Sequence, residues 1–252
     1  LNRLLSLMND KLLLELYSPT GNIANYVQAL WFARAQFSGE SWLPCDGAQG
    51  VIFLISGQLN LAGKPLNLPY SMQTISTQSE KVTFTAGSIF CGIRFKPSEL
   101  AHLKKVNHSL VAPTTLTGIA QALNQHASLD SFIDLLSVHF NAPEVHHHTI
   151  EHTRTLIHKI INLTPLTTAY DDSPKGRRQL ERYVKNTCGI TAKHLARIYR
   201  VRQAKKLIKE NPVLSLAQLA LECGFADQSH LNNEFNAILQ ITPAKYKKLI
   251  HQ

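Results

Sequence analysis

The hydrophobic residues near the C-terminal end follow two short helical patterns separated by a tight turn. Within 216–223, apolar residues recur at i, i+3, i+4 and i+7, which is one face of a helix. Gly224 ends that helix, because glycine reaches the left-handed backbone conformation that a tight turn needs. Asp227 follows as the N-cap of a second helix. The apolar face of this second helix consists of Leu231, Phe235, Ile238 and Leu239. The pattern predicts a helix-turn-helix, whose second helix enters the major groove of DNA.

The opposite face of the second helix is polar and rich in amides. Asparagine is a poor helix former, so three asparagines close together indicate a use beyond stability. Amide side chains pair bidentately with adenine edges in the major groove. A solvated polar face would be the default interpretation of either helix alone, but the turn between them favours DNA reading. The residues expected to contact DNA here are Gln228, Ser229, His230, Asn232, Asn233 and Asn236.

A more basic pattern of the same kind lies at 176–188. Leu180, Val184 and Thr187 face inward, and basic residues occupy the opposite face. Arginine pairs bidentately with guanine or holds phosphates, whereas Glu181 either accepts from cytosine or pairs with an arginine. The DNA-contacting residues predicted here are Arg177, Arg178, Glu181, Arg182 and Lys185.

The elements around this basic helix have less regular patterns. A short supporting helix is expected at 166–171, followed by the sequence Asp171-Asp172-Ser173-Pro174. Because Pro174 disturbs the first helix-turn-helix unit, we expect its base contacts to matter less than those of the second. A long helix at 193–210, ending at Asn211-Pro212, would hold the two units at a fixed spacing.

These patterns resemble the C-terminal domain of the AraC/XylS family of transcription regulators. The matching residues are Ala220, Gly224, Phe225, Gln228, Ser229, His230, Leu231, Phe235, Thr242, Pro243 and Tyr246, together with GRRQLERY at 176–183. The resemblance implies two helix-turn-helix units in 164–252, whose recognition helices lie in successive major grooves roughly 34 Å apart. It implies double-stranded DNA as a partner, and it adds RNA polymerase, a small-molecule effector and a second copy of the chain as candidates.

The N-terminal part shows short runs, some apolar and some alternating, separated by Gly, Pro and Ser turns. Strands are expected at 51–55, 58–61, 70–77, 81–85 and 88–95, with loop at 39–50 and a helix at 97–105. The leucine-rich stretch 1–16 is interrupted by charges and predicts an amphipathic helix or arm rather than a signal peptide. Residues 1–112 are therefore predicted to form a mostly-β, cupin-like small barrel or sandwich. Trp42-Leu43-Pro44 and Gly92-Ile93-Arg94 resemble the sensor domain of some AraC-type regulators.

Residues 113–163 read as helices, with one stripe formed by Leu129, Phe132, Ile133, Leu136 and Phe140. This segment is either a linker that dimerises or a part of its own domain, and the pattern favours neither. The fold class predicted for the whole chain is α+β, a β domain with flanking helices followed by an all-α DNA-binding domain.

Charge separates the two parts of the chain. Residues 1–150 carry 9 Lys+Arg against 9 Asp+Glu, whereas residues 151–252 carry 17 against 8, so the second part holds the entire net charge of +9. A neutral part joined to a basic part is typical of a sensor joined to a polyanion binder. No apolar run approaches the roughly 20 residues of a membrane span, so no membrane partner is expected. Four cysteines far apart are typical of a reducing cytoplasm.

Two other chemistries remain as alternatives. His148 and His152 lie at i and i+4, the spacing of two metal ligands, near His146 and His147. A structural zinc site needs about four ligands, so the prediction is no metal and no cofactor, with His148 and His152 as weak candidates. DNA-alkyl acceptor proteins use a reactive cysteine that follows a proline, and Cys45 follows Pro44 in this chain. The His-Arg sequence that flanks the reactive cysteine of those proteins is absent here.

The sequence thus predicts a cytoplasmic, effector-controlled regulator of transcription, an activator by resemblance, and not an enzyme. The competing classes are a ligand-independent regulator with a dimerising N-terminal domain and a DNA-repair alkyl acceptor.

Overall fold

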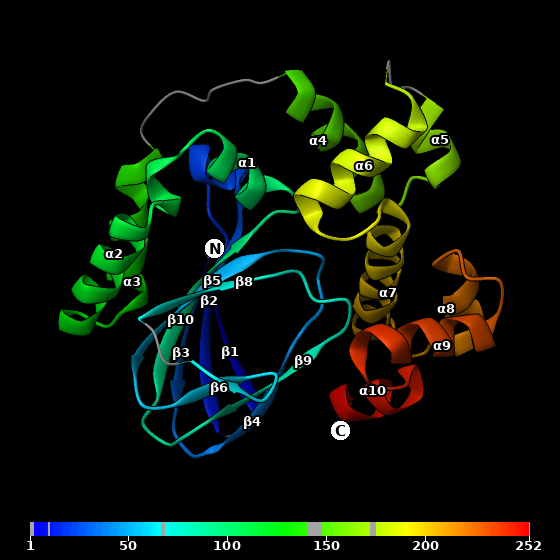
Figure 1. Ribbon diagram of the computed structural model, residues 1–252. Helices are drawn as coiled ribbons and strands as arrows, with labels where there is room; N and C mark the ends of the chain where they lie inside the picture. The colour runs from blue at the N-terminus through cyan, green and yellow to red at the C-terminus, as the bar shows by residue number, and fades with distance from the viewer. Residues whose placement is uncertain (1–2, 10, 67–68, 141–147, 172–174, 252) are drawn as a thin grey trace. The chain divides into compact units, whose positions relative to one another are not determined.

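The computed structural model describes residues 3–9, 11–66, 69–140, 148–171 and 175–251 (Figure 1). The chain divides into two compact units, and neither is continuous in sequence. The N-terminal unit comprises Leu1–Leu43, Ala48–Thr74 and Glu80–Ile150; the C-terminal unit comprises Pro44–Gly47, Ile75–Ser79 and Glu151–Gln252. The first contains two β-sheets and the second is helical, so the predicted α+β class is confirmed.

The strands of the N-terminal unit form two antiparallel sheets. The larger has the order β1-β2-β3-β10-β5-β8, and the smaller has the order β4-β9-β6-β7. In chain order the strands are β1 (Arg3–Asn9), β2 (Leu12–Tyr17), β3 (Val27–Ala35), β4 (Gly39–Leu43), β5 (Gly50–Ser56), β6 (Leu59–Leu61), β7 (Lys64–Pro65), β8 (Tyr70–Gln73), β9 (Glu80–Phe84) and β10 (Ile89–Phe95). The five strands expected from the sequence correspond to β5, β6, β8, β9 and β10.

The helix or arm predicted for 1–16 is wrong, because this stretch forms the hairpin β1–β2. Leucine favours a helix locally, but β2 also pairs with β3, placing Leu14 opposite Ala33 and Leu16 opposite Trp31. Burial against a sheet therefore overrides local propensity. The loop predicted for 39–50 is also wrong in its first part, since β4 pairs with β9 and Trp42 lies opposite Lys81.

The central strands of the larger sheet are buried on both faces. Phe90 and Ile52 pack toward the smaller sheet, while Cys91 and Phe53 belong to the cluster that includes the helices. A strand covered on both sides reads as a continuous apolar run, which explains why β5 and β10 do not alternate. The packing is close at Gly92, where an added Cβ would lie 2.4 Å from the Trp31 ring.

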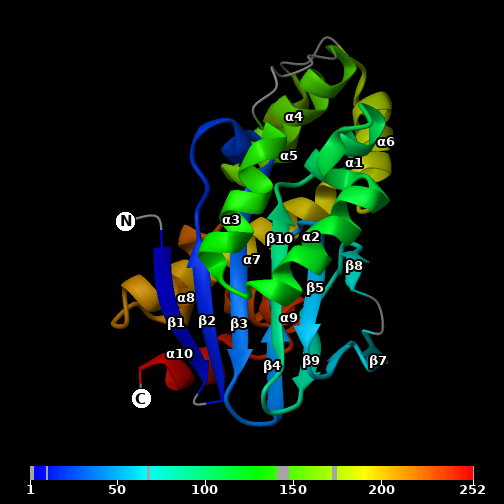
Figure 2. The same cartoon turned by 90° about the vertical axis from the view of Figure 1, so that its left-hand side faces the viewer.

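Two of the helices of this unit, α2 (Pro113–Gln125) and α3 (Leu129–Ser137), cover the outer face of the larger sheet, and a third, α1 (Glu99–Lys105), lies near one end of it (Figure 2). The short turns of the unit are η1 (Gly21–Asn25), η2 (Ser109–Val111) and η3 (Val138–Phe140). Leu116 and Leu123 of α2 and Phe132 and Leu136 of α3 share one apolar core with the strands. The predicted segment 113–163 is therefore divided between the two units. Helices α2 and α3 pack on the sheet of the N-terminal unit, and the residues from Glu151 onward belong to the C-terminal unit.

The C-terminal unit is built around one long helix. Its helices are α4 (His148–Ile161), α5 (Leu166–Asp171), α6 (Arg177–Cys188), α7 (Ala192–Glu210), α8 (Leu216–Glu222), α9 (Gln228–Leu239) and α10 (Pro243–Ile250). The predicted stripe of α7 is buried and joins the apolar faces of the other helices in one core: Leu195, Ile198, Val201, Ala204 and Ile208. The short helix expected at 166–171 is α5 with the same bounds. The sequence Asp172-Ser173-Pro174 lies outside the described residues.

None of the helices in the described part of the chain combines the length and the hydropathy needed to cross a membrane.

Candidate DNA-binding surface

The second helix-turn-helix, α8 and α9, is formed by local signals that fix both ends of its turn. Ser215 and Gln218 form a reciprocal capping box at the start of α8. Gly224 has φ +71°, and the Phe225 N–H donates to the Ala220 carbonyl at 2.9 Å. Asp227 caps α9, since its Oδ1 accepts from the His230 N–H at 2.7 Å. The turn is therefore closed by hydrogen bonds on both sides.

The α9 helix presents its polar face to solvent. Leu231, Phe235 and Ile238 are buried, and the helix packs on α7 and α8 through them. The predicted contact residues Gln228, Ser229, Asn233 and Asn236 are exposed. His230 and Asn232 are half-buried, and Asn232 lies next to the buried stripe. Four of the six predicted contact residues are thus exposed to solvent, and the other two lie at the edges of the polar face of α9.

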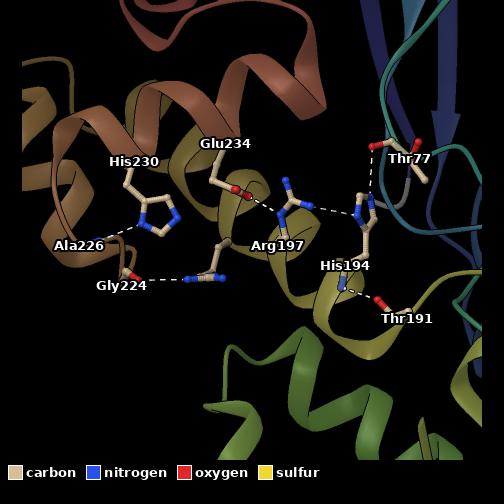
Figure 3. Close-up of polar contacts among 9 residues, drawn as sticks. Thr77, Thr191, His194, Arg197, Gly224, Ala226, His230 and Glu234 are labelled. Carbon is tan, nitrogen blue, oxygen red and sulfur yellow. Dashed lines mark hydrogen bonds and ion pairs between the residues drawn. The ribbon is translucent and has the colours of Figure 1, made fainter. Parts of the chain in front are cut away.

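An ion pair holds α9 against the long helix. Arg197 Nε on α7 donates to Glu234 Oε2 on α9 at 2.6 Å, and neither side chain is more than 30% exposed (Figure 3). Arg197 Nη1 lies 3.3 Å from His194 Nδ1, within the same helix. Sequence reasoning missed this contact, because its two partners lie 37 positions apart and belong to no local pattern.

Arg200 of α7 contacts the turn between α8 and α9. Its Nη1 donates to the Gly224 carbonyl at 3.2 Å, and its guanidinium lies 5.6 Å from the centre of the Phe225 ring. The Phe225 ring in turn meets the His230 imidazole edge to face, with centroids 5.4 Å apart. The Ala226 N–H donates to His230 Nδ1 at 3.3 Å. Side chains of α7 and α9 thereby hold the loop that precedes the recognition helix.

The first unit presents a basic face on α6. Leu180 and Val184 are buried, whereas Arg178, Arg182 and Lys185 are exposed. A cation facing solvent in this way can contact a phosphate or a base edge. Thr187 is half-buried, and its hydroxyl donates back to the Tyr183 carbonyl at 2.8 Å.

Arg177 and Glu181 are paired with each other. Arg177 Nε lies 3.0 Å from Glu181 Oε1, and the guanidinium lies 5.0 Å from the centre of the Tyr170 ring. The hydrogen bond to Glu181 raises the pKa of Arg177. This pairing corresponds to the second of the two roles that the sequence left open for Glu181, and acceptance from cytosine stays a prediction.

Two segments from early in the chain belong to the C-terminal unit. The Ser79 N–H donates to the Ile238 carbonyl at 2.7 Å, and Gln240 Nε2 donates to Gln78 Oε1 at 3.0 Å. The last carbonyls of a helix have no partner inside it. Residues 78–79 therefore provide the C-terminal end of α9 with partners, and no local pattern could have indicated them.

The segment Pro44–Gly47 contacts α7. Arg202 Nη1 donates to the Asp46 carbonyl at 3.1 Å. An added Cβ at Gly47, whose φ is +73°, would lie 2.6 Å from Leu195 Cδ1. Cys45 is buried, and its thiol donates to the Ser76 carbonyl at 3.2 Å. The segment is thus packed into the core of the unit.

Burial sets the ionisation of several groups around α7. It raises the pKa of Tyr199 to about 12, partly offset by the nearby Arg202. It lowers the pKa of Lys205, with repulsion from Lys209 and Arg202 acting in the same direction. Burial, helped by Glu222, raises the pKa of Cys223 to about 11. The Cys223 thiol is therefore protonated at neutral pH and acts as a small core residue.

The weak metal candidates lie on the first turn of α4. His146 and His147 are outside the described residues, and the side chain of His148 is not described. Among the described residues, no group of three or more His, Cys, Asp or Glu side chains could hold a metal ion. The histidine hypothesis thus gains no support from the geometry.

Comparisons with known proteins match residues 175–249 to the helix-turn-helix domain family. A comparison with curated proteins finds no match. Among solved structures, ToxT from Vibrio cholerae is similar at 12% identity with a TM-score of 0.47, covering 96% of this chain and 100% of that chain. Wild-type ToxT from Vibrio cholerae strain SCE256 bound to unsaturated fatty acid is similar at 11% identity and a TM-score of 0.43, covering 96% of both chains. The xylose-binding transcription activator XylR matches 44% of this chain and 29% of its own at 16% identity, with a TM-score of 0.33.

Proposed function

Since residues 175–249 match a helix-turn-helix domain family, we propose that the chain is a sequence-specific DNA-binding regulator of transcription of the AraC type. In this proposal α6 and α9 are the two recognition helices, and they enter successive major grooves of one DNA duplex. Within the second, Gln228, Ser229 and Asn233 read bases, with His230 at the N-terminal tip. Within the first, Arg178 and Arg182 read bases or hold phosphates.

The observation that carries the proposal is the pairing of exposed polar faces with buried apolar ones on two helices attached to one rigid spacer. α9 exposes Asn233 and Asn236 and buries Leu231 and Phe235 in the core that also contains the α7 stripe. Helix α7 has 19 residues, which gives it a length of roughly 28 Å. This length is of the same order as one turn of DNA, about 34 Å. Two recognition helices attached to one spacer of this length suit two successive grooves.

The experiment is a selection of bound duplexes from a random DNA pool with the full-length chain. We expect one consensus with two groups of preferred base pairs, separated by about 10 base pairs. Enrichment of no sequence over the starting pool would contradict the proposal. Enrichment of a single short group would reduce it to one functional reader.

We further propose that a small-molecule effector binds the N-terminal unit and alters DNA affinity. The even charge balance of residues 1–150 supports a sensor rather than a second polyanion binder. The alternative is a ligand-independent regulator in which this unit dimerises. Thermal unfolding against a metabolite library, with sedimentation measured on the same samples, separates the two. A ligand that raises the unfolding temperature and changes DNA affinity supports the effector; a constant dimer without any ligand response supports the alternative.

The third class, a DNA-repair alkyl acceptor, requires an accessible nucleophilic cysteine. Cys45, its candidate, is buried at 3% exposure and donates its thiol hydrogen bond to the Ser76 carbonyl. A reactive thiolate needs a cationic and partly exposed environment. The geometry of Cys45 favours the regulator over this class. Incubation with methylated DNA followed by mass spectrometry of Cys45 tests it, and methyl transfer would contradict the regulator.

A further inference from the structure

We propose that His230 is a specificity-determining residue that donates a hydrogen bond from Nε2–H to a base in the major groove and thereby excludes cytosine at that position. The inference rests on the proposed function and deepens it, because it assigns a direction to one hydrogen bond. His230 lies in the first turn of α9, at the end of the helix that reaches deepest into a groove in helix-turn-helix complexes.

The direction follows from the partner of the other ring nitrogen. The backbone N–H of Ala226 donates to His230 Nδ1 at 3.3 Å (Figure 3). A backbone N–H can only donate, so Nδ1 must be unprotonated. In a neutral imidazole one nitrogen accepts and the other carries the proton. The proton of the His230 ring is therefore on Nε2, and Nε2–H is a hydrogen-bond donor.

The orientation of the ring is fixed as well as its tautomer. The imidazole stands edge to face against Phe225 with an interplanar angle of 84°. Phe225 itself is buried beneath the guanidinium of Arg200, which also donates to the Gly224 carbonyl. The backbone N–H of His230 is bound by the Asp227 cap. Two contacts of the ring, with Ala226 and Phe225, thus set its orientation and its proton position before DNA arrives, which lowers the entropic cost of the contact.

A fixed donor distinguishes the bases by their acceptors. In the major groove guanine offers N7 and O6, adenine offers N7, and thymine offers O4. Cytosine presents only its N4 amino group, which is also a donor. Two donors facing each other leave both unsatisfied, and a site built on a hydrogen bond rejects the base that lacks the matching group. Cytosine is therefore the base that His230 discriminates against.

The experiment compares the full-length chain with His230→Phe on every single-base variant of the selected DNA site. Phenylalanine keeps a ring against Phe225 and removes both nitrogens. For the original chain we expect one base pair at which cytosine binds roughly three- to tenfold more weakly than the other bases. His230→Phe should abolish that preference at this base pair and leave the others. Asn236→Ala, on the same exposed face, is the control and should leave the cytosine penalty intact.

A second measurement tests the tautomer without DNA. Nitrogen-15 shifts of the His230 ring should identify Nδ1 as the unprotonated nitrogen. A proton on Nδ1 would overturn the inference. Equal weakening of all sequences by His230→Phe would also overturn it, because it would indicate a phosphate contact. If the original chain selects no site, the proposed function fails and this inference with it; a selected site without a cytosine penalty removes the inference alone.

Discussion

Arg197 on the spacer helix α7 and Glu234 on the recognition helix α9 form an ion pair of 2.6 Å. Since the two side chains are 30% and 15% exposed, the contact is only partly screened by solvent. In the proposed function, it joins the helix that sets the spacing, α7, to the helix that reads the groove, α9.

We expect this pair to orient α9. Arg197→Met and Glu234→Gln should each reduce the free energy of unfolding by roughly 1–3 kcal/mol, and the double variant should lose less than the sum of both. Denaturant unfolding and DNA affinity, measured on all four proteins, give the coupling energy. The surface pair Lys206–Glu210 is a matched control, because both of its side chains are more than half exposed. Strict additivity at Arg197–Glu234 would mean that the pair orients nothing.

Salt should weaken DNA binding strongly, because the whole net charge of +9 comes from residues 151–252. Each neutralised phosphate steepens the plot of log affinity against log salt by about 0.9. Lys185 is exposed on α6 and more suited to phosphate than to a base. Lys185→Ala should therefore weaken all sequences alike and reduce the slope by about 0.9. Titrations at several salt concentrations check both; an affinity that ignores salt would contradict them.

Apolar truncations in α9 should act through folding and not through readout. Leu231 and Phe235 are both 0% exposed. Leu231→Ala or Phe235→Ala should cost roughly 2–5 kcal/mol through lost packing and the cavity left behind. Circular dichroism during denaturation should show the loss. If either variant keeps its stability but changes base preference, the assignment of faces on α9 is incorrect.

Tyr199 should make the unit sensitive to alkali. Its pKa is raised by burial to about 12, whereas an unfolded tyrosine titrates near 10. The unfolded chain loses this proton first, so the contribution to the free energy of unfolding is complete below pH about 10 and is lost as pH rises toward 12. The loss amounts to roughly 2–3 kcal/mol. Tyr199→Phe should lack this component, and subtraction of the two profiles removes the opposite trend of Lys205. Parallel profiles would contradict the burial of an ionisable phenol.

The elements that could be predicted from the sequence are those whose signals are local. Gly224 and Asp227 mark the turn by backbone conformation and capping, and the apolar period of α7 marks a long helix. These signals lie within a few residues of the structure that they determine, so they act whatever the rest of the chain does.

The parts that could not be predicted depend on distant partners. The stretch that contains β1 and β2 forms a hairpin rather than a helix because β2 also pairs with β3, although its leucines favour a helix. The partners that Gln78 and Ser79 provide to α9 lie about 160 positions upstream of that helix. The Arg197–Glu234 pair likewise joins two helices that only the tertiary fold brings together. The exposed residues of both readers were predictable, but what positions them was not.

The two readers differ in how completely they are supported. α9 is held by the Arg197–Glu234 pair, by Arg200 at its turn, and by residues 78–79 at its C-terminal end. α6 follows a supporting helix of only six residues, α5. That the second reader contributes more to specificity stays a prediction, and Pro174, on which it was based, lies outside the described residues.

The measurement that tests the account most directly is the binding profile of the full-length chain, Asn233→Ala and Arg178→Ala on every single-base variant of the selected site. We expect the original chain to discriminate at two groups of base pairs. Each variant should lose about 1–3 kcal/mol on the selected site and relax preference at one or two base pairs in one group only. The larger loss should belong to Asn233→Ala. Equal binding to all sequences would contradict the central claim. Erased specificity in Arg178→Ala, with specificity intact in Asn233→Ala, would contradict the ranking of the two readers.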